Sequence, residues 1–84
     1  AHCGVCDVVF GKTEELLKNY PQVKQITVSI EEMPDIAGEF LVFTAPTILV
    51  FMDGKEVFRQ SRFVMFRELE ETLQLLIESG KSNE

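Results

Sequence analysis

Basic residues are scarce in this sequence. Eight Lys and Arg stand against 14 Asp and Glu, which gives a formal net charge of −6. Nucleic acids and anionic membrane surfaces attract proteins through clustered Lys and Arg, so we expect neither as the main partner. No apolar run approaches the ~18–20 residues that span a bilayer, and the first residues lack the pattern of a signal peptide. We therefore expect no nucleic-acid partner and no membrane partner.

Cysteine is scarce as well. The two cysteines, Cys3 and Cys6, are too few to form the disulfide framework that stabilises a small secreted domain. Their spacing is typical of a redox-active pair, of half a metal site completed by a second chain, or of an inert pair in a binding module. The run from His2 to Asp7 offers four potential metal ligands, but neighbouring side chains rarely converge on one tetrahedral ion, and the sequence has no second Cys/His pair. We therefore expect no metal and favour the redox pair.

The size and composition predict one small domain over residues 1–84. Hydrophobic residues make up 45% of the chain and charged residues 26%, as in ordinary soluble globular proteins. A chain of this length buries roughly 60–65% of its unfolded surface, enough for one modest core.

Apolar periodicity predicts the helices and strands. Steps of three and four residues predict an amphipathic helix from Cys3 to just before Pro21, and alternation predicts a strand over residues 23–30. The unbroken apolar run at residues 47–52 predicts a central strand covered on both faces. The remaining predictions are a short helix at residues 35–40, an Asp53-Gly54 hairpin turn, an edge strand at residues 55–60, and a helix from Met65 that Gly80 ends.

This order predicts an α/β protein with a central mixed sheet flanked by helices. The first helix has no strand before it, so we expect that a first strand is missing from the chain as given. The alternative is a strand supplied by another chain. The predicted stripe of the first helix consists of Val5, Val9, Phe10, Leu16, Leu17 and Tyr20.

The start of a helix changes the reactivity of a Cys-x-x-Cys pair that lies there. Free backbone N–H groups and the positive end of the helix dipole stabilise an anion at Cys3, which lowers the pKa of its thiol. Cys6 lies one turn later and is expected to be more buried. It can attack a mixed disulfide at Cys3 and release the product.

Three motifs together resemble the thioredoxin superfamily. They are Cys3-Gly4-Val5-Cys6 before a helix, Thr44-Ala45-Pro46-Thr47 before the apolar strand, and the hairpin Phe51-Met52-Asp53-Gly54-Lys55 before a final amphipathic helix. The resemblance covers nearly the whole chain and implies a thioredoxin-like fold. It implies Cys3 as the nucleophile and Cys6 as the resolving thiol. It also implies a cis Pro46 that shapes a substrate groove, and an Ala45 backbone that pairs with a substrate strand.

The resemblance implies a thiol–disulfide oxidoreductase that reduces protein disulfides and needs no cofactor. Its electrons would come from a reductase or a small thiol. An acidic chain without a visible export signal suits a reducing cytoplasm, so we expect a reductant there. The alternatives are a non-enzymatic thioredoxin-fold interaction module and an oxidase or isomerase of secreted proteins.

Four positions depart from the usual family pattern. His2 replaces the usual Trp, Val5 the usual Pro, Asp7 the usual Lys, and Arg62 stands near a position where glycine is usual. A positive His2 imidazole would lower the pKa of Cys3, whereas the alternative is an exposed loop histidine. Asp7 either favours the helix dipole or raises the pKa of Cys6.

Two further features bear on partners. Arg62 is either an ordinary solvated charge or a groove residue that favours an acidic partner. The run Phe40-Leu41-Val42-Phe43 is expected to be mostly core, with one or two side chains at a partner groove.

Overall fold

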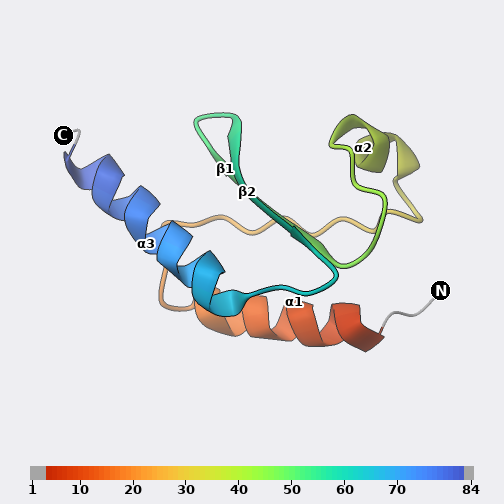
Figure 1. Ribbon diagram of the computed structural model, residues 1–84, viewed down its shortest axis with the longest axis horizontal. Coiled ribbons are helices and arrows are strands. Elements are labelled where there is room, and N and C mark those ends of the chain that lie inside the picture. Colours follow the sequence, from red (N-terminus) through yellow and green to blue (C-terminus); the bar gives the residue numbers. More distant parts are fainter. Residues whose placement is uncertain (1–3, 83–84) are drawn as a thin grey trace. The chain divides into compact units, whose positions relative to one another are not determined.

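The computed structural model describes the backbone of residues 4–82 and the side chains of residues 4–79 (Figure 1). The chain divides into two compact units, residues 1–46 and residues 47–84. The single domain expected over residues 1–84 stays a prediction. Within the described residues, no helix combines the length and the apolar character needed to cross a membrane.

Helix α1 spans Gly4–Leu17 and confirms the predicted first helix. Beyond Leu17 the backbone hydrogen bonds change from the α-helical spacing of four residues to a spacing of three. The N–H groups of Lys18, Asn19 and Tyr20 donate to carbonyls three residues back, at 3.3, 3.1 and 3.0 Å. These bonds satisfy the last helical carbonyls before Pro21, whose ring disfavours helical backbone in the residue that precedes it.

One face of α1 is half-buried, but it is not quite the predicted stripe. Val5 and Phe10 are exposed, whereas Cys6 and Thr13 belong to the half-buried face. Thr13 fits this face because its hydroxyl donates to the Val9 carbonyl at 2.7 Å, which satisfies its polar group locally. The half-buried positions follow steps of three and four residues: Cys6, Val9, Thr13, Leu16, Leu17 and Tyr20.

The predicted strand over residues 23–30 is wrong. This segment is irregular chain between α1 and α2, and its Ile26 side chain is 75% exposed. A strand needs a neighbour that completes its ladder of backbone hydrogen bonds. The described residues form one sheet of two strands, and neither strand pairs with this segment. The alternation is present in the sequence, but the pairing that would make it a strand is not.

Helix α2 spans Pro34–Glu39 and confirms the predicted short helix, with Pro34 in its first turn. It ends in a tight hydrogen-bonded motif. The Leu41 N–H donates to the Gly38 carbonyl at 3.2 Å, and the Val42 N–H donates to the Ala37 carbonyl at 2.8 Å. This is the Schellman pattern, which places the residue after the cap in the left-handed region. Leu41 occupies that position with φ of 57°, where glycine is the usual residue.

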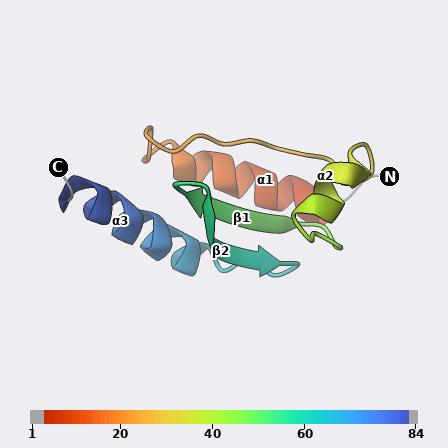
Figure 2. The same ribbon diagram turned by 90° about the horizontal axis from the view of Figure 1, so that it is seen from above.

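The second unit contains the predicted hairpin (Figure 2). Strand β1 spans Thr47–Met52 and strand β2 spans Lys55–Ser61, and the two are antiparallel. Asp53 and Gly54 both have positive φ, 54° and 79°, as the tightest hairpin turns require. The expectation that β1 is central and covered on both faces is wrong. Its residues are half-buried, Phe51 is exposed, and within residues 4–82 only β2 pairs with it.

A bulge interrupts the hairpin. Val50 pairs with Phe58 and Phe51 pairs with Glu56, so Val57 is an extra residue on β2. The extra residue shifts the alternation and lets Glu56 meet Arg59. The Arg59 guanidinium donates twice to the Glu56 carboxylate, from Nε to Oε2 and from Nη2 to Oε1, each at 2.8 Å. These hydrogen bonds hold the pKa of Glu56 below its ordinary value.

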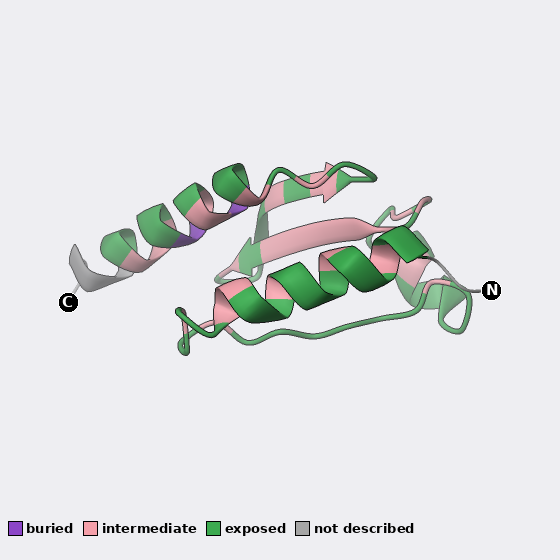
Figure 3. Ribbon diagram, turned by 90° about the horizontal axis from the view of Figure 1, so that it is seen from below, coloured by how far each residue is buried: buried purple, intermediate pink, exposed green. Residues whose placement is uncertain are grey.

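Helix α3 spans Phe66–Ser82 and carries Leu69 and Leu73, the most buried residues among the side chains that the structure describes. They lie on one side of the helix (Figure 3), as the predicted stripe required. The helix continues past Gly80, so the predicted stop there is wrong. A helix can pass through glycine at a cost of about 1 kcal/mol relative to alanine, provided that its hydrogen bonds continue.

A sharp turn joins β2 to α3. The Phe63 N–H donates to the Ser61 carbonyl at 2.8 Å, and the residue between them, Arg62, has φ of 68°. Gln60 spans this turn. Its side-chain oxygen accepts from the Met65 N–H at 2.6 Å, and its side-chain nitrogen donates to Glu68 at 2.7 Å. Gln60 therefore satisfies backbone at the start of α3.

Because of the Glu56–Arg59 pair, the free energy of unfolding should decrease as the pH is lowered into the acid range. Because the folded-state pKa of Glu56 is lowered, its contribution is fully present above its unfolded pKa, and it is lost as the pH falls through the folded pKa. We expect Arg59→Gln to raise the pKa of Glu56 in a carboxyl NMR titration. The difference in free energy of unfolding between wild type and variant should be present at pH 7 and shrink below about pH 4. Arg67→Gln is the control, since Arg67 faces Glu71 at 3.8 Å. An unchanged Glu56 pKa in Arg59→Gln would contradict the assignment.

Leu41→Gly should stabilise the protein by about 1 kcal/mol, because glycine adopts positive φ without steric cost. The leucine side chain is 63% exposed, so its removal forfeits little burial. Phe43→Gly is the control. Its side chain is also exposed, but its φ is not positive, so glycine there should only add unfolded-state entropy and destabilise the protein. Urea denaturation measures the free energy of unfolding of both variants. A loss of stability in Leu41→Gly equal to that in Phe43→Gly would refute the prediction.

Candidate active site

Cys6 lies in the first turn of α1, on the half-buried face of that helix. It is disulfide-bonded, and the described part of the chain contains no free cysteine. The sequence has one other cysteine, Cys3. Cys3 and His2 lie outside the described residues. Cys6 is half-buried, and the prediction that it is the more buried of the two thiols stays a prediction.

The residues beside Cys6 are open to solvent. Gly4 and Val5 are both exposed, and a side chain at Gly4 would meet no atom within 4 Å. A small side chain would therefore fit at Gly4 without a clash. The 14-residue helix also directs its unpaired N–H groups and the positive end of its dipole to this end.

Asp7 is exposed and lies in the same first turn. A carboxylate there interacts favourably with the helix dipole, which is the stabilising role that the sequence suggested. The position is also next to Cys6 in the chain, so both roles considered for Asp7 stay predictions.

Ala45 and Pro46 lie in the loop that leads from α2 to β1. The peptide bond between them is cis, Ala45 is exposed and Pro46 is half-buried. This loop and the start of α1 belong to the same compact unit and lie at the same end of it in two perpendicular views (Figures 1 and 2). Cys6 and Asp7 belong to the start of α1 and Ala45 and Pro46 to the loop; that the four residues form one site stays a prediction.

The apolar run before Ala45 is more exposed than expected. Leu41 and Phe43 are 63% and 81% exposed, and Phe40 is exposed as well, so the expectation that most of the run is core is wrong. Only Val42 is half-buried. A sequence signal for this exists: Gly38 and Glu39 end a short helix, and four consecutive apolar residues in the following turn cannot all point to one side.

Comparison of this chain with known proteins identifies its family. The sequence model of the Thioredoxin family matches residues 1–76. The thioredoxin-like protein YdfQ of Bacillus subtilis (strain 168) is 38% identical over 71 residues, which is 84% of this chain. Thioredoxin-1 of Saccharomyces cerevisiae is 34% identical over 55 residues, or 66% of this chain.

A solved structure supports the same conclusion. Thioredoxin 1 of Thermosipho africanus TCF52B superposes with a TM-score of 0.83 at 25% identity, covering 94% of this chain and 88% of that one. The predicted thioredoxin-like fold class is therefore confirmed. The predicted mixed sheet is not seen among the described residues, which form one antiparallel pair of strands, because the segment at residues 23–30 does not pair with them.

The chain is shorter than the curated relatives it matches. It covers 63% of the Bacillus protein and 53% of the yeast protein. The family model nevertheless matches most of this chain, from the Cys-x-x-Cys motif into α3. The chain belongs to the thioredoxin family.

Proposed function

We propose that this protein is a thiol–disulfide oxidoreductase that reduces protein disulfides through Cys3 and Cys6. One observation carries the proposal: Cys6 is disulfide-bonded in the first turn of a helix whose end is open to solvent. A disulfide at that position is the oxidised product that a dithiol reductase leaves on itself. Family membership supports the same chemistry.

The reaction proceeds in two exchanges. The Cys3 thiolate attacks one sulfur of the substrate disulfide, a Cys3–substrate bond forms, and the other substrate sulfur leaves as a thiolate that takes up a proton. Cys6 then loses its proton and attacks the Cys3 sulfur. The Cys3–Cys6 bond forms, and the second substrate sulfur leaves as a thiol. Two electrons have passed from the protein to the substrate.

The remaining parts of the site position the substrate. The exposed Ala45 backbone pairs with an extended segment of the substrate, and Pro46 shapes the groove beside it. A reductase or a small thiol restores the dithiol afterwards, and no prosthetic group takes part. The acidic chain works as a reductant in the cytoplasm.

Cysteine variants test the chemistry. We expect Cys3→Ser to abolish reduction of insulin disulfides by dithiothreitol above the uncatalysed rate, because the attacking sulfur is lost. Cys6→Ser should slow turnover and accumulate a mixed disulfide at Cys3, visible by non-reducing electrophoresis and intact mass. Asp53→Ser, in the hairpin turn, is the matched control and should keep the wild-type rate.

The rival is a non-enzymatic interaction module whose cysteines take no part. Wild-type activity equal to that of Cys3→Ser would favour this module and exclude the proposed chemistry. The half-buried position of Cys6 is compatible with either protein, so the rates decide between them.

The reduction potential tests the direction. We expect a value near the reducing end of the range of about −270 to −120 mV for this fold, and a value near −120 mV would instead favour an oxidase. The same titration on His2→Ala tests the proposed tuning by His2. If the imidazolium stabilises the Cys3 thiolate, the variant should have a more negative potential than the wild type at pH 6 and a smaller difference at pH 8. Equal potentials at both pH values would assign His2 to an exposed loop.

A further inference from the structure

We infer that the α2 end of the first unit is a docking surface for a basic and apolar segment of a partner polypeptide. The surface, called here the acidic apolar surface, goes beyond the thiol chemistry and does not require it. Its apolar residues are Ile36, Phe40, Leu41 and Phe43, and its acidic residues are Glu31, Glu32, Asp35 and Glu39.

The apolar part of the surface is exposed to solvent. All four of its side chains are exposed although they fall within eight consecutive residues, and Phe43 is 81% exposed. Scattered apolar residues on a surface are ordinary, but a contiguous group is typical of an interaction site. Aromatic side chains are the commonest anchors of such sites because they bury large areas with few rotatable bonds.

Leu41 gives an independent reason to assign a role to this loop. Its positive φ makes leucine a costly residue at the end of α2, where glycine would complete the same hydrogen-bonded motif without strain. Burial does not offset this cost, because 63% of the side chain is exposed. The largely exposed side chain of Leu41 is therefore available to a docked partner.

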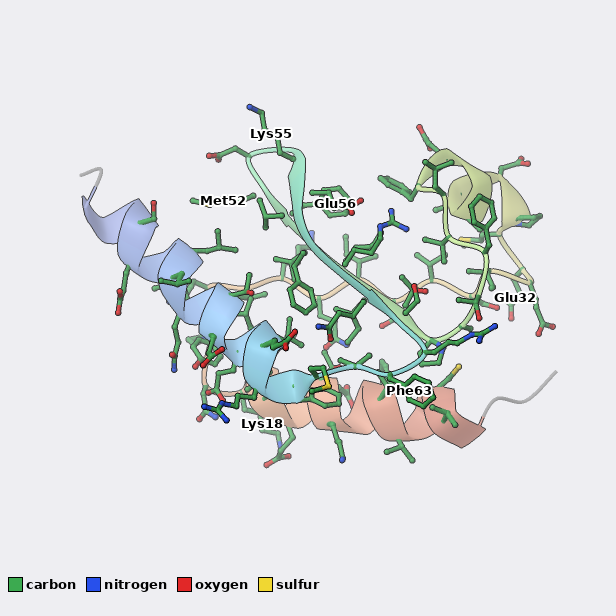
Figure 4. All side chains as sticks on the ribbon, in the orientation of Figure 1. Lys18, Glu32, Met52, Lys55, Glu56 and Phe63 are labelled. Carbon is green, nitrogen blue, oxygen red and sulfur yellow. The ribbon has the colours of Figure 1, made fainter. Side chains whose placement is uncertain are left out.

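Charge identifies the kind of partner. Between Lys24 and Lys55 the sequence contains five acidic residues and no Lys or Arg, and four of the five lie within residues 31–39. These four are exposed, and Glu32 projects from the chain beside α2 (Figure 4). An apolar centre with a charged rim is the usual anatomy of a protein interface. The rim here is of one sign, so it selects Lys and Arg on the partner.

The same charge argues against the other occupants. Nucleic acid and anionic lipid would be repelled by the rim. A second copy of this chain would place two acidic rims against each other, which disfavours self-association. A polypeptide segment with Lys or Arg flanking Leu or Phe satisfies both the apolar centre and the rim.

The test uses the intact protein carrying Cys3→Ser and Cys6→Ser, so that thiol exchange cannot contribute and the proposed reductase activity can fail without affecting the result. The probe is a labelled eight-residue peptide of alternating Lys and Leu. Peptides of alternating Glu and Leu, and of alternating Lys and Ser, are the controls. We expect only the Lys–Leu peptide to bind, with backbone amide NMR shifts concentrated at residues 31–43, and its affinity to fall as salt is raised.

Variants of the surface sharpen the test. Phe43→Ser should weaken the Lys–Leu peptide about tenfold, the loss expected from one aromatic anchor. Leu41→Gly should weaken binding while it raises stability, which separates loss of contact from unfolding. Glu32→Lys with Glu39→Lys makes the rim neutral, with two acidic and two basic residues, and should abolish the preference for the Lys–Leu peptide over the Glu–Leu peptide. The control, Glu14→Lys with Glu78→Lys, changes the net charge equally, from −6 to −2, but lies on other helices and should leave the preference intact.

Three results would overturn the inference. The first is equal binding of the Lys–Ser peptide, which would mean attraction by net charge alone. The second is a set of amide shifts centred outside residues 31–43. The third is a dimer in sedimentation equilibrium that Phe43→Ser dissociates, since the surface would then bind a second copy of the chain.

Discussion

Backbone hydrogen bonds between strands decide which extended segments of this protein become a sheet. Residues 47–52 and 55–61 have each other as partners, and the turn at Asp53-Gly54 brings them into register. Residues 23–30 have an equally regular alternation but no partner strand among the described residues. Alternation fixes which side chains share a face, whereas a ladder needs a second chain segment at the right distance.

Positive φ angles mark the places where the chain must turn sharply. Four described residues have them, and only one of these is glycine: Leu41, Asp53, Gly54 and Arg62. Asp53 is a residue type that tolerates this conformation, but Leu41 and Arg62 are not. Arg62 follows directly on β2, Leu41 lies two residues after the end of α2, and both are exposed. The protein thus has sterically costly backbone conformations at exposed positions near the ends of its regular elements.

The first unit combines two properties that are useful to a protein of the thioredoxin family. One end of α1 presents Cys6 on a sheltered face next to open positions at Gly4 and Val5. The loop after α2 carries exposed apolar side chains within an acidic segment and runs directly into Ala45 and Pro46. Leu41, Phe43 and their acidic neighbours in this loop form the proposed partner surface.

The sequence by itself determined the local features. Periodicity and turn chemistry placed α1, α2, the hairpin and the stripe of α3 within a few residues, because helices and tight turns are stabilised by neighbours in the chain. The three motifs also identified the family. Tertiary structure alone decided burial and pairing: that residues 23–30 stay unpaired, that β1 is only half-buried, that α3 continues through Gly80, and that Phe40, Leu41 and Phe43 face solvent. An apolar side chain is buried only if another element arrives to cover it, and that depends on segments distant in sequence.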